Sequence, residues 1–283
     1  HHEVTVIDNL STGFVNKIPE DVEFIKGDIG SETDVSKLYG RRFDVIYHIA
    51  GQSSGEISYD DPVYDLNTNT KSTLLLLKFA ESCSCSNFIF MSSMSVYGDR
   101  MDRPVLEDDE TSPLSFYGVG KLASEHYLRI DSNKGMRKTV LRLCNTYGPG
   151  QNMDNLRQGM VSIFIKQAID HGEILVKGSK ERFRDFIHIS DVVDVLVLLL
   201  EDYGYNFEIF NLTGGVKKKV SDLVEAIHNG VDTDLSVLYR GSTPGDQFGV
   251  CANNSKIKKN LSWEPKIDFE QGIVNMVKWY KTL

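Results

Sequence analysis

Short apolar segments alternate with helical segments along the first half of the chain, and this alternation is the feature that most constrains its fold. The segments with the length and apolar content of buried strands are residues 3–8, 22–26, 43–48, 87–91, 139–143 and 206–211. Helical periodicity is found between them, in residues 31–39, 63–82 and 118–130. This order predicts an α/β fold with a doubly wound parallel sheet, because parallel neighbours are joined by helical crossovers.

The sequence changes after Asn145, where polar loops rich in Gly, Asn and Arg replace the regular alternation. Further helices are expected at residues 161–171 and 190–201, and from Ser221, whose hydroxyl would cap the last one. We therefore expect a sheet-based domain over residues 1–145 and a smaller mixed lobe over 146–283. The strand at 206–211 is expected to return to the sheet of the first domain.

The composition excludes several kinds of protein. With 41% hydrophobic and 25% charged residues the chain is typical of soluble globular proteins, and its net charge of −9 argues against a nucleic-acid partner. The apolar run 196–200 is too short to span a membrane and no signal peptide is recognisable, so we expect no membrane partner and a cytoplasmic location. The cysteines, whose spacing predicts neither a disulfide framework nor a metal site, are Cys83, Cys85, Cys144 and Cys251.

Tyr117 and Lys121 are the strongest candidates for chemistry. On a helix this spacing puts both side chains on one face, a turn apart. A phenol has a pKa near ~10, and a nearby ammonium with a second positive charge in a poorly hydrated cleft can bring it toward ~7. The pair is therefore a candidate general base with the cation that tunes it, although many exposed helices carry the same spacing without a function.

Polar residues follow two of the expected strands directly. Ser92 and Ser93 come after the run 87–91, and Asn145 comes after the run 139–143. Open α/β sheets bind their ligands at the carboxyl ends of their strands. The serine hydroxyls are therefore expected at a ligand-binding edge of the sheet.

Taken in order, these motifs resemble the extended short-chain dehydrogenase/reductase family, and within it the NAD-dependent nucleotide-sugar epimerases and dehydratases. The branch that inverts C4 of a UDP-linked hexose is the most similar. The matching segments span nearly the whole chain and are residues 6–13 (VIDNLSTG), 27–29 (GDI), 48–52 (HIAGQ), 92–98 (SSMSVYG), 117–121 (YGVGK), 142–149 (RLCNTYGP) and 184–188 (RDFIH).

The resemblance implies a Rossmann-like domain that binds NAD. Asp8 would accept the ribose hydroxyls and repel the 2′-phosphate of NADP, unless it only caps a turn. The implied cofactor-binding residues are Asp8, Asn9, Asp28, Ile29, Ala50, Gly51, Gln52, Asn69, Ser92, Tyr117 and Lys121. In this family a first strand and a Gly-x-x-Gly-x-x-Gly turn precede the strand that ends at Asp8. Neither is in this sequence, so we expect the sequence to be partial.

The resemblance also implies the catalytic and substrate-binding residues. The catalytic set is Ser93, Tyr117 and Lys121, with Ser93 holding the sugar hydroxyl that gives its proton to Tyr117. The substrate-binding set is Ser93, Asn145, Arg184, Arg240 and Asp246. Asn145 and Arg184 would hold the diphosphate, unless Arg184 forms a surface ion pair with Asp185. Arg240 would replace a family arginine at the position that Thr243 occupies here.

Met94 and Ser95 separate the possible reactions. Dehydratases of this branch carry Asp-Glu after the active hydroxyl residue and decarboxylases keep the Glu, whereas neither Met94 nor Ser95 can act as an acid or base. This favours C4 epimerisation of a UDP-hexose. Small residues near Val250 and Cys251, where the family gates hexose size, would leave room for an N-acetyl group. The alternatives are another epimerase, reductase or dehydratase of the family, or a non-catalytic sensor of NAD(P) or nucleotide sugars.

Assembly is a further implication of the resemblance. The apolar segment 74–79 and the helix of Tyr117 resemble elements that pair across a two-fold axis as a four-helix bundle. A homodimer is therefore expected.

Overall fold

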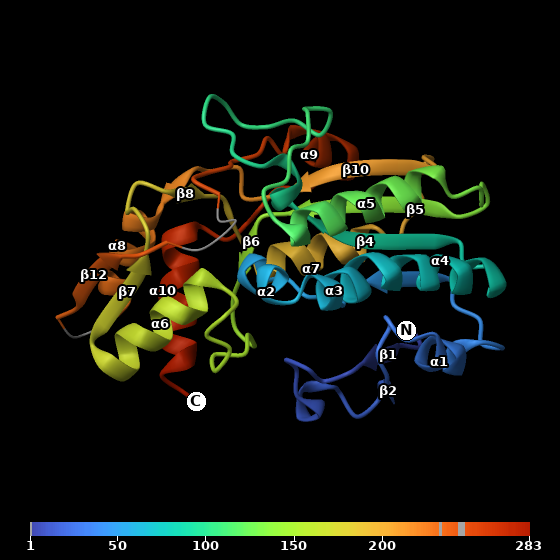
Figure 1. Cartoon of the computed structure of the whole chain (residues 1–283), viewed down its shortest axis with the longest axis horizontal. Coiled ribbons are helices and arrows are strands. Elements are labelled where there is room, and N and C mark those ends of the chain that lie inside the picture. Colours follow the sequence, from blue (N-terminus) through green and yellow to red (C-terminus); the bar gives the residue numbers. More distant parts are fainter. Residues whose placement is uncertain (1, 232–233, 243–246) are drawn as a thin grey trace.

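The computed structural model describes residues 2–231, 234–242 and 247–283. Its centre is a parallel four-stranded sheet with the strand order β10-β5-β4-β3 (Figure 1). These strands are β3 (Val45–His48), β4 (Asn87–Ser93), β5 (Arg137–Leu143) and β10 (Phe207–Leu212). A separate parallel pair is formed by β1 (Thr5–Asp8) and β2 (Glu23–Lys26). The predicted α/β fold with a parallel sheet is confirmed, including the return of a late strand to the sheet.

Both faces of the central sheet are buried, which explains why its strands are continuously apolar. Phe88 and Phe90 of β4 pack in the same apolar cluster as Leu76 of α4 (Ser72–Ser82) and Leu128 of α5 (Phe116–Ile130). The alternate residue Ile89 packs in the cluster that contains residues of α7 (Ile189–Leu198). Since successive strand residues point to opposite faces, α4 and α5 cover one face and α7 covers the other.

The second half of the chain builds a lobe with its own apolar core. Ile165, Ile174, Leu223 and Met276 are completely or almost completely buried in it. The helices around this core are α6 (Met160–His171), α8 (Val220–Gly230) and α10 (Phe269–Tyr280). The short strands of the lobe are β6 (Asn145–Tyr147), β7 (Glu173–Lys177), β8 (Phe183–Arg184), β9 (Phe186–His188), β11 (Lys218–Lys219) and β12 (Ser236–Arg240).

The remaining helices are short. They are α1 (Glu32–Val35), α2 (Gly55–Asp60), α3 (Pro62–Asp65) and α9 (Ser255–Leu261), with 3-10 turns at Val15–Lys17, Ser36–Leu38 and Met94–Tyr97. No helix in the described part of the chain is long and apolar enough to span a membrane.

One local prediction from the sequence is confirmed with a difference in detail, and another is wrong. The helical stretch expected over 63–82 runs without a break from α3 to α4, but its middle part, Leu66–Lys71, is a π-helix, which apolar periodicity does not reveal. Ser221 does not begin and cap the next helix, because the cap position of α8 is Lys219. There the Asp222 carboxylate accepts the Lys219 backbone N–H at 2.8 Å. The carboxylate stabilises the helix start in place of the serine hydroxyl.

Candidate active site

A cleft of about 620 Å³ lies where β4 and β5 end, between the sheet and the lobe. The predicted site residues that line it are Gly51, Ser92, Ser93, Tyr117, Lys121, Asn145 and Arg184. The structure thus brings together the catalytic set and the two residues expected to hold a diphosphate, which come from separate parts of the sequence.

The N-terminal turn of α5 places Tyr117 against the end of β4. The Ser115 hydroxyl caps this helix by accepting the Gly118 backbone N–H at 3.1 Å. A Cβ on Gly118 would lie 2.8 Å from the Ser95 carbonyl oxygen, so glycine permits this close approach. The Tyr117 side chain is only 9% exposed, and Ser93 lies close enough to lower the pKa of its hydroxyl. The Ser93 hydroxyl in turn accepts the Ser95 backbone N–H at 3.1 Å.

Lys121 lies one turn further along α5, below Tyr117. Its side chain is buried, and Nζ donates to the Met91 carbonyl oxygen at 2.9 Å. Nζ also lies 4.9 Å from the centre of the Phe90 ring and 5.9 Å from that of Tyr117. Burial lowers the pKa of Lys121 to about 8, because the ammonium has lost most of its water.

The expectation that Lys121 brings the Tyr117 phenol toward neutral pKa does not hold for the protein chain alone. Burial raises the pKa of Tyr117 to about 12, and the hydrogen bond with Ser93 lowers it only in part. The phenolate is more costly to bury than the neutral phenol, and the Asp65 charge adds to this cost.

Ser92 is held by a buried ion pair that the sequence analysis missed. Its hydroxyl donates to Glu125 Oε1 at 2.5 Å, and Arg142 donates to both oxygens of Glu125, with Nη2 to Oε2 at 2.7 Å. Arg142 Nη1 also donates to the Tyr97 hydroxyl at 2.8 Å. Glu125 stands one turn after Lys121 on the buried face of α5, and this spacing is the signal that could have revealed it. With its hydroxyl bonded to Glu125, Ser92 supports the turn at the end of β4.

A second cavity, of about 300 Å³, lies beside the end of β1. Asp8 lines it, and Asp8 Oδ1 also accepts the Leu10 backbone N–H at 2.6 Å, so the expected turn cap is present. Asn9 Nδ2 donates to Asp28 Oδ2 at 3.2 Å, and Ile29 is buried next to it. These residues fit the ribose end of a dinucleotide, with a carboxylate at the tip of a parallel strand.

The loop after β3 leaves space next to Lys121. A Cβ on Gly51 would lie 3.4 Å from Lys121 Nζ and would collide with Asn69 Oδ1, so a side chain is excluded there. Asn69 Oδ1 is buried, and no partner for it is found within residues 2–231, 234–242 and 247–283. Ala50, which is half-buried, and Gln52, which is buried, flank this glycine. A cradle of small residues with an unsatisfied acceptor fits the nicotinamide end of the cofactor.

Arg184 and Asn145 enter the cleft from the lobe. Arg184 is 6% exposed, its Nη2 donates to the Gln247 carbonyl oxygen at 2.7 Å, and burial lowers its pKa to about 10. Asn145 Nδ2 donates to the Asp185 carbonyl oxygen at 3.2 Å. Asp185 is itself 1% exposed and accepts the Gly215 backbone N–H, so the alternative of a surface ion pair with Arg184 is wrong.

The other predicted substrate residues have different positions. Arg240 is exposed at the end of β12 and is not among the residues that line either cavity. Asp246 lies outside the described residues. Val250 lines the cleft, whereas the Cys251 thiol points to Asp185 Oδ2 at 3.3 Å.

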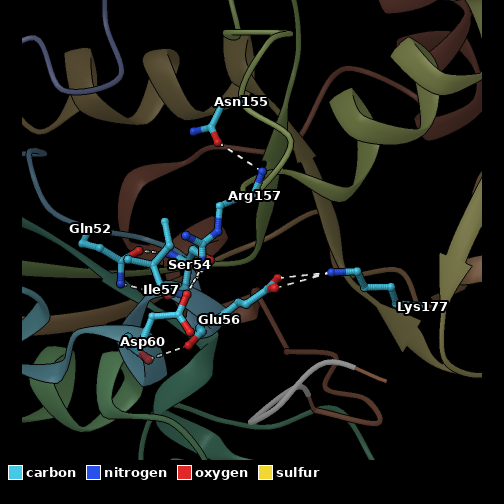
Figure 2. Close-up of polar contacts among 10 residues, drawn as sticks. Gln52, Ser54, Glu56, Ile57, Asp60, Asn155, Arg157 and Lys177 are labelled. Atoms are coloured by element: carbon cyan, nitrogen blue, oxygen red, sulfur yellow. Dashed lines mark hydrogen bonds and ion pairs between the residues drawn. The ribbon is translucent and has the colours of Figure 1, made fainter. Parts of the chain in front are cut away.

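Cations that the sequence analysis did not single out also line the cleft: they are Arg157, Lys177 and Arg182. Figure 2 shows two of them reaching α2 across the entrance. Lys177 Nζ lies 3.5 Å from Glu56 Oε2, and Arg157 pairs with Asp60. We call these two contacts the entrance pairs. Within the described residues, no cluster of His, Cys, Asp or Glu could hold a metal ion.

Fold and site together define a class of enzyme. A parallel α/β sheet that carries Ser, Tyr and Lys at its carboxyl edge and an Asp at the tip of a neighbouring strand is the arrangement of an NAD-binding short-chain dehydrogenase/reductase. The family model that matches is the NAD dependent epimerase/dehydratase family, over residues 1–213. The chain belongs to this family, and the predictions of the family, of an enzyme and of NAD as cofactor are confirmed.

Individual relatives are similar over nearly the whole chain. The putative UDP-glucose 4-epimerase of Methanocaldococcus jannaschii is 29% identical, covering 99% of this chain and 91% of that protein. UDP-glucuronic acid decarboxylase 1 of Arabidopsis thaliana is 30% identical, covering 99% of this chain and 64% of that protein. The crystal structure of the Thermotoga maritima UDP-glucose 4-epimerase with UDP-glucose has a TM-score of 0.93 at 30% identity, covering 99% of this chain and 91% of that chain. Because the relatives include an epimerase and a decarboxylase, the choice of reaction rests on the cleft.

The first testable prediction concerns the buried ion pair under Ser92. Arg142→Met leaves the Glu125 carboxylate buried without its partner, so the free energy of unfolding should fall by about 3–5 kcal/mol in urea denaturation. Arg103→Met is the matched control, since Arg103 pairs with Asp109 at 2.7 Å on the surface and should change stability little. Equal losses in both variants would contradict a special role for the buried pair.

Proposed function

We propose that the protein is an NAD-dependent epimerase that inverts C4 of a UDP-linked hexose. The observation that carries the proposal is the burial of Tyr117 beside Ser93 and one turn from the buried Lys121, in a cleft whose described lining residues include no carboxylate other than Glu56. Residues 1–145 would hold the cofactor, and residues 146–283 would hold most of the nucleotide sugar.

The three side chains divide the proton chemistry between them. Tyr117 would take the proton from the C4 hydroxyl and later return it, and Ser93 would hold that hydroxyl in line. Lys121 would supply the positive charge that stabilises the phenolate. NAD, when bound, would accept the hydride from C4 and give it back to the opposite face of the sugar.

The lining of the cleft disfavours elimination and decarboxylation. Met94 and Ser95 line the cleft. They stand at the positions where the dehydratases and decarboxylases of this family carry acidic residues. Among the described lining residues the only carboxylate is Glu56, which pairs with Lys177 at the entrance. The described residues that line the cleft therefore offer no carboxylate beside Ser93 and Tyr117 that could act in elimination or decarboxylation.

The cationic wall of the cleft supports a diphosphate substrate. Arg184 and Asn145 approach from the lobe, and Arg182 and Lys177 add positive charge near them. The buried guanidinium of Arg184 places a positive charge on this wall, although its Nη1 and Nη2 already donate to backbone carbonyls. Val250, a small side chain on the same wall, leaves room for an N-acetyl substituent, so UDP-N-acetylhexoses are included in the proposal.

The second testable prediction is that the protein, in full length with NAD, interconverts the C4 epimers of a UDP-hexose without net NADH. Tyr117→Phe should lower turnover at least about 100-fold, the usual scale of a lost acid–base group. Tyr127→Phe removes a hydroxyl from the same helix and serves as the control. The measurement is NMR of a panel of UDP-sugars, with NADH followed by absorbance.

Other outcomes would redirect the assignment. Stoichiometric NADH release would indicate a dehydrogenase, and loss of carbon dioxide from a UDP-uronic acid would indicate a decarboxylase. Tight binding without any turnover would indicate a sensor of nucleotide sugars.

The third testable prediction concerns cofactor choice. Because the Asp8 carboxylate at the tip of β1 would repel a 2′-phosphate, Asp8→Ala should weaken NAD binding more than NADP binding in calorimetric titrations. Asp21→Ala, a change of the same charge on an exposed loop, should affect neither. A parallel loss of both cofactors in Asp8→Ala would show that Asp8 only shapes the turn.

We also propose a homodimer. α2, α3 and α4 all pack against α5, and the outer surface of this group carries exposed apolar side chains. They are Tyr59, Val63, Leu66, Leu74, Phe116 and Val119. Exposed apolar side chains gathered on one group of packed helices are typical of an interface, and a two-fold axis would pair this group with itself.

The fourth testable prediction follows from that surface. The protein should have the mass of a dimer by light scattering at micromolar concentration, and Val119→Glu should produce monomers by burying a charge in the interface. Val216→Glu is matched in exposure, 55% against 53%, and lies on a loop, so it should remain dimeric. A monomeric unmodified protein would refute the proposal.

A further inference from the structure

Asp65 is a buried carboxylate directly behind the proposed catalytic pair. It ends α3, whose first turn is capped by Asp61 through the Tyr64 backbone N–H at 2.9 Å. Asp61 is exposed, whereas Asp65, one turn later on the inner face of the helix, is only 1% exposed. Taking a carboxylate out of water costs several kcal/mol unless hydrogen bonds and an opposite charge compensate. The environment of Asp65 must therefore supply both.

The hydrogen bonds come from two predicted cofactor residues. Asp65 Oδ1 accepts from Gln52 Nε2 at 2.7 Å and from Asn69 Nδ2 at 3.0 Å. The π-helix Leu66–Lys71 starts directly after Asp65, and its wide turn returns the Asn69 amide to Oδ1. With its Nδ2 donating to Asp65, Asn69 turns its unsatisfied Oδ1 toward Gly51 and Lys121. The other carboxylate oxygen, Oδ2, faces α5 at Gly120, next to Lys121.

The opposite charge must come from one of the charged groups around Tyr117 and Lys121. On α5 these are Lys121 and Glu125, and on β5 Arg142, which is fully engaged with Glu125. On β3, His48 is buried and neutral, since burial and the Lys121 charge lower its pKa to about 3. Tyr117 is neutral in the protein chain. Burial raises the pKa of Asp65, and the hydrogen bonds from Gln52 and Asn69 and the Lys121 charge act against this rise. Lys121 and Asp65 therefore remain as the two groups that can carry opposite charges, although the described residues give neither a direct ion pair.

We propose that Asp65 is the buried counter-ion of Lys121 and a positioning residue for the active site, which keeps the ammonium charged and fixes the orientation of Asn69. This inference rests on the proposed function for its kinetic consequence, whereas its electrostatic part concerns the chain alone. Asp65 touches neither the reacting atoms nor the cleft wall, so it acts through Lys121 and Asn69.

The sign of the effect is the same for both members of the catalytic pair. The Asp65 charge raises the pKa of Lys121 because it stabilises the ammonium, and it raises the pKa of Tyr117 because it disfavours the phenolate. Neutralising Asp65 therefore lowers both pKa values. Any pH profile that depends on the pair moves as a whole toward acid, whereas a merely structural defect lowers activity at every pH.

The fifth testable prediction uses Asp65→Asn, with Asp61→Asn as a control of equal charge on the same short helix. The pKa of Lys121, followed by NMR of 13C-labelled lysine and assigned with Lys121→Arg, should fall by about 1 unit or more in Asp65→Asn and stay unchanged in Asp61→Asn. The pH optimum of turnover should shift toward acid by a similar amount. An unchanged Lys121 titration in folded Asp65→Asn would overturn the proposal.

A second measurement needs no substitution, which keeps the proposal testable if Asp65→Asn does not fold. The carboxyl 13C resonance of Asp65 in the unmodified protein should show an ionised group at pH 7, and a carboxyl still protonated at that pH could not be a counter-ion. Both titrations are independent of substrate, so a protein that lacks epimerase activity but shows the Lys121 shift would refute the proposed function and support this inference.

Discussion

The burial of the Lys121 ammonium between α5 and the end of β4 is the interaction on which the rest of the site depends. An ammonium that has lost its water requires a hydrogen-bond acceptor. The Met91 carbonyl oxygen, near the end of β4, provides it. The glycine at position 118 lets α5 approach closely enough for this contact. The lowered pKa of Lys121 leaves its charge sensitive to its neighbours. Two nearby carboxylates are Glu125, which is paired with Arg142, and Asp65, which is not. Their charges therefore influence the fraction of Lys121 that stays protonated near neutral pH.

Much of this arrangement could be predicted from the sequence. The strands were recognisable because burial on both faces makes them continuously apolar, and Tyr117 and Lys121 were recognisable because four-residue spacing is a local property of a helix. Ser93 and Asn145 could be placed because parallel strands end at one edge. Each of these inferences needs only neighbours in the sequence and one rule about sheets.

The parts that the sequence did not reveal depend on contacts between distant segments. Glu125 meets Arg142 across a helix–sheet interface, and neither sequence position indicates which charge the other will face. The π-helix after Asp65 leaves almost no trace in the apolar pattern, because it shifts the register by a single residue. The raised pKa of Tyr117 in the protein chain alone could not be predicted for a related reason, since the extent of burial is a property of the whole fold. Arg240 shows the limit of motif matching, as a residue three positions from a family arginine ends on the outer surface.

The two entrance pairs differ from the buried charge of Lys121 in the cleft because they are exposed to solvent. The side chains of Arg157 and Asp60 are 48% and 60% exposed, so mobile ions compete for both partners, with a screening length of about 10 Å at 0.1 M ionic strength. Exposed side chains of this type reorient within nanoseconds, so these contacts open and close on that timescale. Dissolved salt therefore weakens the entrance pairs but does not screen the buried ammonium of Lys121. The strength of the entrance pairs and the protonation of Lys121 are separate properties, and each can be altered by substitution without the other.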